Sequence, residues 1–498
     1  MSSKGRTRDF GSCNDGSNPS IPATRLIIEV THVMKNLCVL VMAAGKGTRM
    51  KSATPKVLQP VLDRPIIDYV IRNVLSAGIT QEDLAVLVGS GGEEVESHIT
   101  ENYPNAKIIW QHEQLGTGHA VKTAQNFWSE YEKLIVLNGD LPMMKPESLK
   151  RLISSAGEND CTVITFEAEN PGAYGRIIRG KNSVSIIENK DASPEQREIH
   201  EVNAGCYAFN VKSLLRIIDS ITNNNAQHEY YITDALALMN DAGMTTGAFI
   251  MPESEMQGVN TQAELARVSR EMRKEILTHW MNEGVRISDP DSVYIGADVI
   301  LSHDVTIMPN VQIYGRTRIG SGSVIGSGSI LTNAAIGENV HVIAYAVIEN
   351  STLKNGVKAG PFCYIRDNTI LEENSFAGKF VELKNSRIGE GSKVPHLSYM
   401  GDATLGHDVN IGAGSITCNY DGEHKNKTHI GDNCFIGSNT MFVAPVEVGD
   451  GSTTAAGSVI TQRVPENSLG VGRARQTNIA DWSLRNHHHH KTTTEGEK

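Results

Sequence analysis

The sequence predicts an α/β domain followed by a triangular prism of short parallel strands. In the first half, apolar runs alternate with helical patterns, which is typical of buried parallel strands joined by helices. From about Val285 to Val464, an aliphatic residue returns every six positions. A period of six fits neither a helix nor a long strand, but it fits short strands separated by tight turns.

The six-residue repeat predicts the architecture of the second half. One aliphatic side chain per hexad points inward, and Gly, Asn or Asp occupies the bends. Three hexads would close one coil of about eighteen residues. A glycine-rich linker would not repeat an aliphatic residue at a fixed phase. The clearest hexads begin at Ile295, Leu301, Ile307, Ile313, Ile319, Ile325, Ile336, Ile388, Leu405, Ile411, Ile430, Ile436 and Val448.

Length and composition exclude several classes of protein. The chain has 498 residues, enough for two or three domains, and a net charge of -11 that argues against nucleic acid as a partner. No apolar run approaches the roughly 20 residues of a membrane span. Seven cysteines are scattered singly, without metal-like spacing, which favours a cytoplasmic chain with reduced thiols.

Both ends of the chain are expected to be disordered. Residues 1–34 are polar and mixed, and their apolar patch is too short for a signal peptide, so Met34 is the expected natural start. The tail, residues 476–498, contains the run His487–His490. Such a run can bind metal, although a solvated tail or a tag is the favoured interpretation.

A candidate phosphate loop follows the first predicted strand, Leu37 to Met42. Small residues at 43–47 would let backbone amides approach phosphate oxygens. Arg49 and Lys56 would add positive charge there. The spacing matches neither the Walker pattern nor the dinucleotide fingerprint. A Gly-Lys-Gly run alone would also fit an ordinary turn.

Further elements suggest a mostly parallel sheet with its ligand at the carboxyl ends of the strands. Asp140 follows a predicted strand at this edge. A carboxylate there could bind Mg²⁺ together with substrate phosphates, or it could simply form a turn. The predicted strands are Leu84 to Val88, Lys107 to Trp110, Leu134 to Leu137 and Cys161 to Phe166, and the predicted helices are Asp68 to Ala77 and Thr117 to Phe127.

An amphipathic helix is predicted at the joint, from Thr261 to Glu283, with Gly284 ending it. An arm packed along the neighbouring domain is favoured over a membrane or cofactor helix. In the repeat domain, polar stretches interrupt the hexads at Pro395–Tyr399 and again at Gly412–Gly422. Histidine titrates near neutral pH, so His396 could accept a proton from an amine, although one loop histidine is more often structural.

Several ordered motifs together resemble the bacterial bifunctional family of N-acetylglucosamine-1-phosphate uridylyltransferases and glucosamine-1-phosphate N-acetyltransferases. The resemblance covers about residues 35–475. It rests on the loop AAGKGTRM (43–50) with Pro55-Lys56, and on QHEQLGTGHA (111–120), YGRI (174–177), ENKDA (188–192), NAG (203–205), NNNAQHEYYITD (223–234) and GVN (258–260).

The resemblance implies a Rossmann-like nucleotidyltransferase domain followed by a left-handed parallel β-helix in a homotrimer. The β-helix would acetylate glucosamine 1-phosphate with acetyl-CoA, and the first domain would join N-acetylglucosamine 1-phosphate to UMP from UTP, assisted by Mg²⁺. The implied boundaries are 35–260 for the uridylyltransferase, 261–284 for a linker helix and 285–475 for the acetyltransferase.

The resemblance also assigns residues to the first reaction. Arg49 and Lys56 would be catalytic through their charge, and Asp140 and Asn260 would hold Mg²⁺. Gln111 could pair with the pyrimidine through its donor and its acceptor. Asn138 departs from several relatives, which carry an aromatic residue there. The implied UDP-N-acetylglucosamine contacts are Met42, Ala43, Ala44, Gly45, Lys56, Gln111, Gly116, Thr117, Asn138, Gly139, Asp140, Gly175, Glu188, Asn203 and Asn260.

For acetyl transfer, the resemblance makes His396 the general base. Transfer would be direct, because Cys418 and Cys434 are interpreted as packing residues rather than nucleophiles. The implied contacts to glucosamine 1-phosphate are Arg366, Lys384, Tyr399 and Asn410. Those to acetyl-CoA are Ala413, Asn419, Tyr420, Ser438, Ala456 and Arg473.

Two other functions compete with the bifunctional one. A single-function nucleotidyltransferase with a regulatory β-helix would lack the set of His396, Tyr399 and Asn419. A non-catalytic scaffold subunit would be expected to lose Arg49, Lys56 or Asp140. All of these residues are present.

Overall fold

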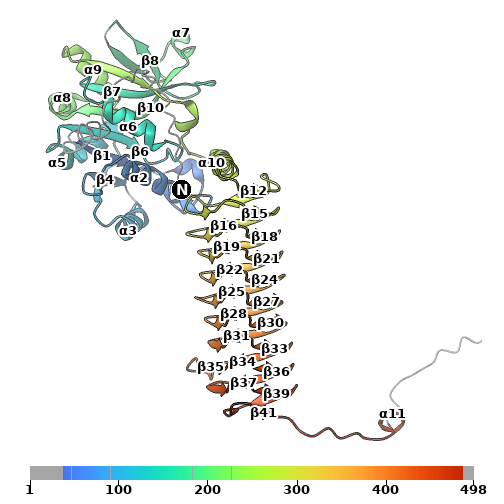
Figure 1. Cartoon of the computed structure of the whole chain (residues 1–498). Helices are drawn as coiled ribbons and strands as arrows, with labels where there is room; N and C mark the ends of the chain where they lie inside the picture. The colour runs from blue at the N-terminus through green and yellow to red at the C-terminus, as the bar shows by residue number, and fades with distance from the viewer. Residues whose placement is uncertain (1–36, 46, 90, 182, 226, 486–498) are drawn as a thin grey trace, which may run out of the picture. The chain divides into compact units, whose positions relative to one another are not determined.

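The computed structural model describes residues 37–485, except 46, 90, 182 and 226. The predictions for residues 1–34, for the lysine of the Gly-Lys-Gly run and for His487–His490 therefore lie outside the described residues. The chain forms two compact units that divide between Met272 and Arg273 (Figure 1). The predicted architecture, an α/β domain followed by a β-helix, is confirmed. None of the helices in the described ranges is long and apolar enough to cross a membrane.

The first unit is built on a mixed sheet with strand order β11-β7-β10-β6-β1-β4-β5. Strand β10 runs antiparallel to both of its neighbours in this order, while the other neighbours are parallel. The path strands are β1 (Leu37–Met42), β4 (Leu84–Gly89), β5 (Lys107–Gln111), β6 (Lys133–Asn138), β7 (Cys161–Glu167), β10 (Glu201–Asn210) and β11 (Thr246–Ile250).

All five strands predicted from apolar runs are present, but the sequence prediction missed β10 and β11. Strand β10 contains Asn203 and Gly205, which are poor strand formers, and its place between two buried strands overrides that preference. A hairpin of β8 (Arg176–Arg179) and β9 (Val184–Ile187) pairs with β10. The short strands β2 (Pro60–Val61) and β3 (Arg64–Pro65) form a separate pair.

Helices cover both faces of this sheet. Alternate residues of β1 pack on opposite sides: Val39 belongs to one buried cluster and Leu40 to the other. One face carries α2 (Ile66–Ser76), α3 (Glu93–Asn102) and α6 (Pro146–Ser155); the other carries α4 (Thr117–Thr123), α5 (Gln125–Trp128), α8 (Val211–Ile217) and α9 (Asp234–Asp241). The predicted helix from Thr117 to Phe127 is thus divided at Ala124. Short elements are α7 (Pro194–Arg197) and the 3-10 turns η1 (Thr48–Met50), η2 (Lys56–Leu58), η3 (Ile218–Ser220) and η4 (Glu253–Glu255).

Helix α10 (Gln262–Asn282) begins with a capping box, because Glu264 N–H donates to Thr261 Oγ1 and Thr261 N–H donates to Glu264 Oε2. In the second unit, Leu277 and Trp280 of its final turns pack against the apolar column of the coils. This fits an arm rather than a membrane helix.

The second unit consists of three parallel sheets that share the strands of successive coils (Figure 1). The first prism sheet contains β12 (Arg286–Ile287), β15 (Thr306–Ile307), β18 (Val324–Ile325), β21 (His341–Val342), β24 (Lys358–Ala359), β27 (Phe376–Lys379), β30 (Lys393–His396), β33 (Asn410–Ile411), β36 (Phe435–Ile436), β39 (Thr453–Thr454) and β41 (Leu469–Gly470). The second contains β13 (Tyr294–Ile295), β16 (Gln312–Tyr314), β19 (Ile330–Thr332), β22 (Val347–Glu349), β25 (Tyr364–Arg366), β28 (Glu382–Lys384), β31 (Tyr399–Gly401), β34 (Ile416–Cys418), β37 (Met441–Val443) and β40 (Val459–Ile460). The third contains β14 (Ile300–Leu301), β17 (Arg318–Ile319), β20 (Ala335–Ile336), β23 (Thr352–Leu353), β26 (Ile370–Leu371), β29 (Arg387–Ile388), β32 (Ala403–Leu405), β35 (Thr428–Ile430) and β38 (Val446–Val448). A short helix, α11 (Trp482–Arg485), follows.

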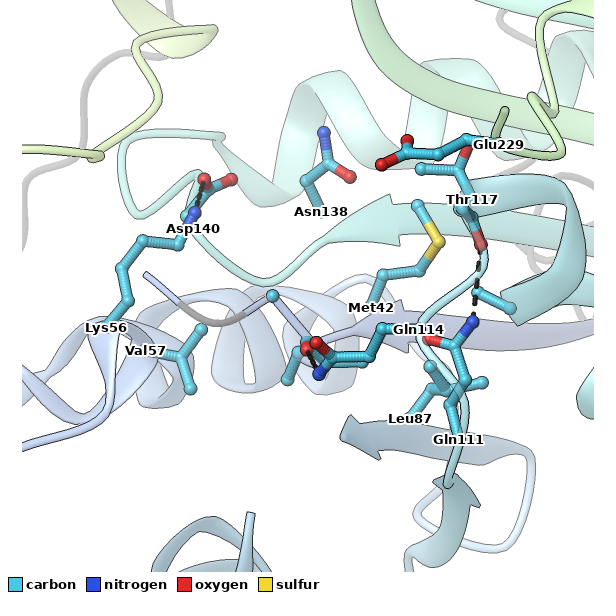
Figure 2. A pocket seen from close by; sticks show the side chains of 15 residues that line it. Met42, Lys56, Val57, Leu87, Gln111, Gln114, Thr117, Asn138, Asp140 and Glu229 are labelled. Atoms are coloured by element: carbon cyan, nitrogen blue, oxygen red, sulfur yellow. Dashed lines mark hydrogen bonds and ion pairs between the residues drawn. The ribbon is translucent and has the colours of Figure 1, made fainter. Parts of the chain in front are cut away.

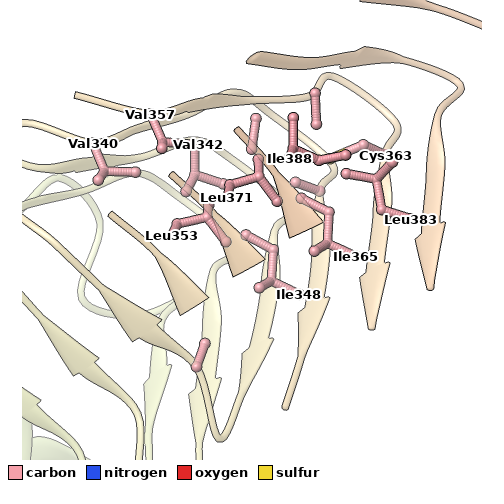
Figure 3. Packing of buried hydrophobic residues seen from close by; sticks show 14 of the residues in the cluster. Val340, Val342, Ile348, Leu353, Val357, Cys363, Ile365, Leu371, Leu383 and Ile388 are labelled. Atoms are coloured by element: carbon pink, nitrogen blue, oxygen red, sulfur yellow. The ribbon is translucent and has the colours of Figure 1, made fainter. Parts of the chain in front are cut away.

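The hexad aliphatics stack in register inside the coils. Ile295 pairs with Ile313, which pairs in turn with Leu331, and all three are buried. Figure 3 shows the same packing in later coils, around Ile348, Leu353 and Ile365. The bends use the left-handed region, as at Asn333 (φ 51°). Left-handed coiling of the helix stays a prediction.

Only one of the two predicted interruptions is a loop. Pro395–Tyr399 continues the coil, because Ala377 pairs with Val394 and Leu383 with Met400 in unbroken register. The extra residues lie between Cys418 and Thr428, where an antiparallel bridge joins Tyr420 to Lys425. The prediction that Pro395–Tyr399 breaks the array was wrong, because the buried Val394 and Met400 keep the inward positions of the coil.

Candidate active sites

A cavity of about 460 Å³ lies at the carboxyl ends of β1, β5 and β6 in the first unit (Figure 2). Parallel strands end at the same sheet edge, so residues far apart in sequence converge there. The predicted residues that line it are Met42, Ala43, Ala44, Gly45, Lys56, Gln111, Gly116, Thr117, Asn138 and Asp140. Gly139 lies between two of them and donates its N–H to Met42 O.

The charged residues predicted for this site form one connected group. Lys56 Nζ lies 2.5 Å from Asp140 Oδ2 and 3.3 Å from Asn260 Oδ1. Arg49 Nη2 donates to the same Asn260 oxygen at 2.8 Å. The backbone N–H of Val259 donates to Asp140 O, which brings the loop after β11 to the end of β6. The Lys56–Asp140 contact is visible in Figure 2.

The oxygens of Asp140 and Asn260 fit a metal ion that takes its remaining ligands from the substrate. Both oxygens face the same ammonium group, so both already contact a cation. Across the described ranges, no group of three or more His, Cys, Asp or Glu side chains could hold a metal by itself. One carboxylate plus one amide oxygen suits Mg²⁺, which takes its remaining ligands from phosphates and water.

At the other end of the cavity, Gln111 Nε2 donates to Gly116 O at 3.3 Å and contacts His119 Nδ1 at 3.0 Å. Both hydrogens of this amide are therefore engaged by the protein, so the expected pairing of Gln111 through donor and acceptor is reduced to its oxygen. Gly116 has φ 112°, and a Cβ there would lie 2.5 Å from Tyr230 O. Only glycine fits this approach.

The predicted sugar contacts form a second cluster. Asn203 N–H donates to Gly175 O at 2.9 Å, and a Cβ on Gly175 would lie 3.6 Å from the Glu188 carboxylate. Burial raises the pKa of Glu188. These three residues do not line the cavity. Asn138 connects the two groups, since its Nδ2 donates to Ala204 O at 3.4 Å, next to Asn203.

Two polar residues of the cavity wall were missed by the sequence predictions. Gln114 donates from Nε2 to Ala44 O at 2.5 Å and so fixes the phosphate loop, and Glu229 lies opposite Thr117 in Figure 2. Both belong to motifs that signalled the site, QHEQLGTGHA and NNNAQHEYYITD. A glutamine or a glutamate in such a motif could equally belong to a turn, so the sequence alone did not identify either residue as a ligand contact.

In the second unit, three cationic side chains gather on neighbouring coils. Arg366 and Lys384 are paired in register on β25 and β28. Lys425 lies within hydrogen-bonding contact of Lys384, and this hydrogen bond, more than desolvation or the charge of Lys425, lowers the pKa of Lys384. Arg366 donates to Glu382 Oε1 and to Asp367 Oδ2 at 2.8 Å each. The sequence prediction missed Lys425, which the antiparallel bridge inside the insertion brings here.

Tyr399 and Asn419 lie beside this cationic group. A Cβ on Gly401 would lie 2.3 Å from the Tyr399 hydroxyl and 2.8 Å from Asn419 Nδ2, so both side chains cross the face of that glycine. Asn419 Nδ2 donates to Asp402 Oδ2 at 2.6 Å. Asn410 lies elsewhere, on β33 in the first prism sheet, in register with Lys393 and Phe435.

The remaining predicted residues follow one corner of the β-helix. His396 is exposed, and strand register places it after Lys379 and before Ala413. At this corner, Asn439 N–H donates to Ala413 O and Gly457 N–H donates to Ser438 O, at 2.8 Å each. Ala456 precedes Gly457, whose added Cβ would lie 3.9 Å from Arg473 Cδ. The structure thus aligns His396, Ala413, Ser438, Ala456 and Arg473 along the prism.

The two cysteines of this region differ. Cys434 is buried, and burial raises the pKa of its thiol. Cys418 is exposed. The prediction that Cys418 packs inside the coil was wrong, because the buried Thr417 takes the inward position of β34 and the next residue, Cys418, faces outward.

Comparison with known proteins agrees with both units. Residues 38–284 match the family model described as nucleotidyl transferase, and residues 298–333 and 427–462 match the bacterial transferase hexapeptide model. The bifunctional protein GlmU of Thermoanaerobacter pseudethanolicus is 44% identical over 453 residues, which cover 90% of this chain and 98% of the relative. That of Thermosipho africanus is 45% identical over 448 residues, covering 90% and 97%.

The chain belongs to the bifunctional GlmU family. Its two units are accordingly a uridylyltransferase and an acetyltransferase that act on small-molecule substrates. Membership also implies a divalent metal requirement for the nucleotidyltransferase unit. Both competing functions, the single-function transferase and the non-catalytic scaffold, are disfavoured by this result.

The packing over Gly401 predicts a selective defect. In a Gly401→Ala variant, the added methyl group should displace Tyr399 and Asn419. We expect acetyltransferase kcat/KM to fall on the order of 100-fold, the loss typical of a misplacement near 1 Å. Uridylyltransferase kcat/KM should not change. Gly157→Ala, where a Cβ would meet only the flexible end of the Lys133 side chain, is the control for alanine in place of glycine. Unchanged acetylation in Gly401→Ala would contradict this packing.

Proposed function

We propose that the chain makes UDP-N-acetylglucosamine in two steps, one in each unit. The second unit acetylates glucosamine 1-phosphate, and the first transfers UMP from UTP to the resulting N-acetylglucosamine 1-phosphate. The observation that carries this proposal is that one chain holds two separate constellations: Lys56, Asp140 and Asn260 around one cavity, and Arg366, Lys384 and Lys425 gathered on the second prism sheet and the insertion.

In uridylyl transfer, the sugar phosphate is itself the nucleophile. One of its oxygens attacks the α-phosphorus of UTP, the bond to the β-phosphate bridging oxygen breaks, and pyrophosphate leaves. The attacking oxygen is already anionic, so no side-chain base is needed. The protein contributes position and charge. Lys56, which pairs with Asp140 in this structure, and Arg49, which donates to Asn260, would neutralise the triphosphate and the leaving pyrophosphate.

Asp140 and Asn260 would hold the metal, which we propose is Mg²⁺ because their two oxygens leave room for phosphate and water ligands. When bound, Mg²⁺ supplies positive charge at the reacting phosphates. The small residues Ala43, Ala44 and Gly45 let the nucleotide approach the end of β1. Gly116, Thr117 and Gln111 face the uracil and ribose end. Gly175, Glu188 and Asn203, together with Asn138, would bind the N-acetylglucosamine ring.

In acetyl transfer, Arg366, Lys384 and Lys425 bind the phosphate of glucosamine 1-phosphate. Three cations at one site without an equal number of bound carboxylates favour an anion. The pKa of Lys384 is lowered first by its hydrogen bond with Lys425, then by desolvation, and then by the positive charge of Lys425. Tyr399 and Asn410 would contact the sugar.

His396 would take a proton from the 2-amino group of glucosamine 1-phosphate as the amino nitrogen attacks the acetyl carbonyl of acetyl-CoA. The new C–N bond forms, the C–S bond breaks, and the imidazolium gives its proton to the departing CoA thiolate. Acetyl-CoA would lie along the corner of Ala413, Ser438, Ala456 and Arg473, against Tyr420 of the insertion. Asn419 or Ser438 could donate to the oxyanion. No cysteine is needed as a nucleophile.

We also propose that the active molecule is a homotrimer in the cytoplasm. An apolar ridge runs along the corner that bears His396: Tyr345, Phe362, Phe380 and Leu397 are 55%, 49%, 61% and 64% exposed. The rings stack at 5.2 and 5.4 Å between centroids. Each residue has positive φ, which costs a bulky residue about 1–3 kcal/mol.

Such exposure and strain favour a ridge that another copy of the chain covers. The same assembly would explain Asn410, which lies on a different sheet from Arg366, Lys384 and Tyr399. A neighbouring copy could supply it to a shared site. The cytoplasmic location rests on the six described cysteines, which are all free thiols.

The proposed general base gives a direct prediction. His396→Ala should lower acetyltransferase kcat by roughly 10²- to 10⁴-fold, the usual contribution of a general base, while leaving uridylyl transfer unchanged. Both rates are measured on the same purified protein. His341→Ala, at another exposed histidine of the β-helix, is the control. Equal loss of both activities in a folded His396→Ala protein would contradict the two-site proposal.

The proposed assembly predicts an order of losses. A Phe362→Asp/Phe380→Asp variant should sediment as a monomer, because two carboxylates in the covered ridge would be desolvated. Acetylation should be lost, and uridylylation retained. Ile300→Asp, at a partly exposed position on the third prism sheet, should keep the wild-type mass. A double variant of unchanged mass, or one that loses uridylylation first, would sink the assignment of this ridge.

A further inference from the structure

His119 is a polar residue of the first unit to which neither reaction assigns a role. It lies in the first turn of α4, directly after the Gly116 turn. Its ring is partly buried, with its centroid 6.4 Å from that of Tyr230. Its backbone carbonyl accepts from Thr123 Oγ1 at 2.8 Å.

The contact between Gln111 and His119 has only one consistent hydrogen-bond pattern. Gly116 O can only accept, so the Gln111 atom 3.3 Å from it is the amide nitrogen. That same nitrogen lies 3.0 Å from His119 Nδ1, which must therefore be the unprotonated, accepting nitrogen of the ring.

This hydrogen-bond pattern determines which atom of the Gln111 amide faces the cavity. Gln111 is almost fully buried and can turn its amide only by exchanging the positions of nitrogen and oxygen. In the exchanged orientation, Gln111 Oε1 would face Gly116 O, which can only accept, and His119 Nδ1 would need a proton to pair with that oxygen. An acceptor–acceptor contact in a buried site is unfavourable. With the nitrogen engaged, the oxygen remains for the ligand.

We infer that His119 is a positioning residue for base selection: by accepting from Gln111 Nε2, it holds Gln111 Oε1 toward the nucleotide as an acceptor. An acceptor there suits the ring N–H of uracil. It disfavours cytosine, whose corresponding ring nitrogen is itself an acceptor. The inference deepens the proposed uridylyl transfer and rests on UTP being its substrate.

Two variants separate this role from simple packing. His119→Phe keeps a ring of similar size but removes the acceptor. His119→Asn loses the ring but keeps a short acceptor, Oδ1, in place of Nδ1. A packing role predicts that Asn is the more damaging change, and a positioning role predicts that Phe is. His112→Phe, at a neighbouring exposed histidine, is the control.

The readout is the ratio of kcat/KM for UTP to that for CTP in the full chain, with N-acetylglucosamine 1-phosphate and Mg²⁺. We expect His119→Phe to lower this ratio roughly fivefold to tenfold, as loss of one neutral hydrogen bond would. His119→Asn should keep most of the preference, and His112→Phe all of it. An unchanged ratio in His119→Phe, or a greater loss in His119→Asn, would overturn the inference. Failure of the wild-type chain to use UTP would instead overturn the proposed function.

Discussion

Every coil of the second unit must close around one column of aliphatic side chains, and the rest of that unit depends on this constraint. The inward positions are fixed by packing, as at Ile295, Ile313 and Leu331. Function is therefore confined to positions that face outward, at corners and in the single insertion. The corner of His396 carries polar or small residues in some coils and exposed rings in others. Because strand register repeats each coil, residues distant in sequence align along one edge.

The first unit is under a different constraint, because its site must bind highly charged substrates. Its sheet brings the ends of β1, β5 and β6 to one edge, and small residues occupy the loops there. The polar side chains of the site already have partners: Lys56 contacts Asp140 and Asn260, and Arg49 donates to the same Asn260 oxygen. Binding phosphate and metal would exchange these partners rather than desolvate unpaired charges, which limits the cost of forming the complex.

The sequence could predict whatever depends on period or on local residue chemistry. The hexads give the β-helix, and apolar runs give β1, β4, β5, β6 and β7. The features that the sequence did not predict also have physical causes. Strand β10 depends on its neighbours rather than on its own residues, and Lys425 reaches Lys384 only because the insertion folds back. Pro395–Tyr399 looks like a break because its residues are unusual, yet Val394 and Met400 keep the phase. The orientation of the Gln111 amide needs coordinates, since it depends on Gly116 O and His119.

The central claim is that two independent sites in one chain act in sequence on one sugar. It is tested most directly by supplying acetyl-labelled acetyl-CoA, glucosamine 1-phosphate, UTP and Mg²⁺ to the purified protein and omitting each in turn. The account predicts that label reaches a nucleotide sugar only in the complete mixture. Without UTP or Mg²⁺, label should stop in N-acetylglucosamine 1-phosphate. The claim would be contradicted if no sugar became labelled under any condition, or if acetylation required UTP.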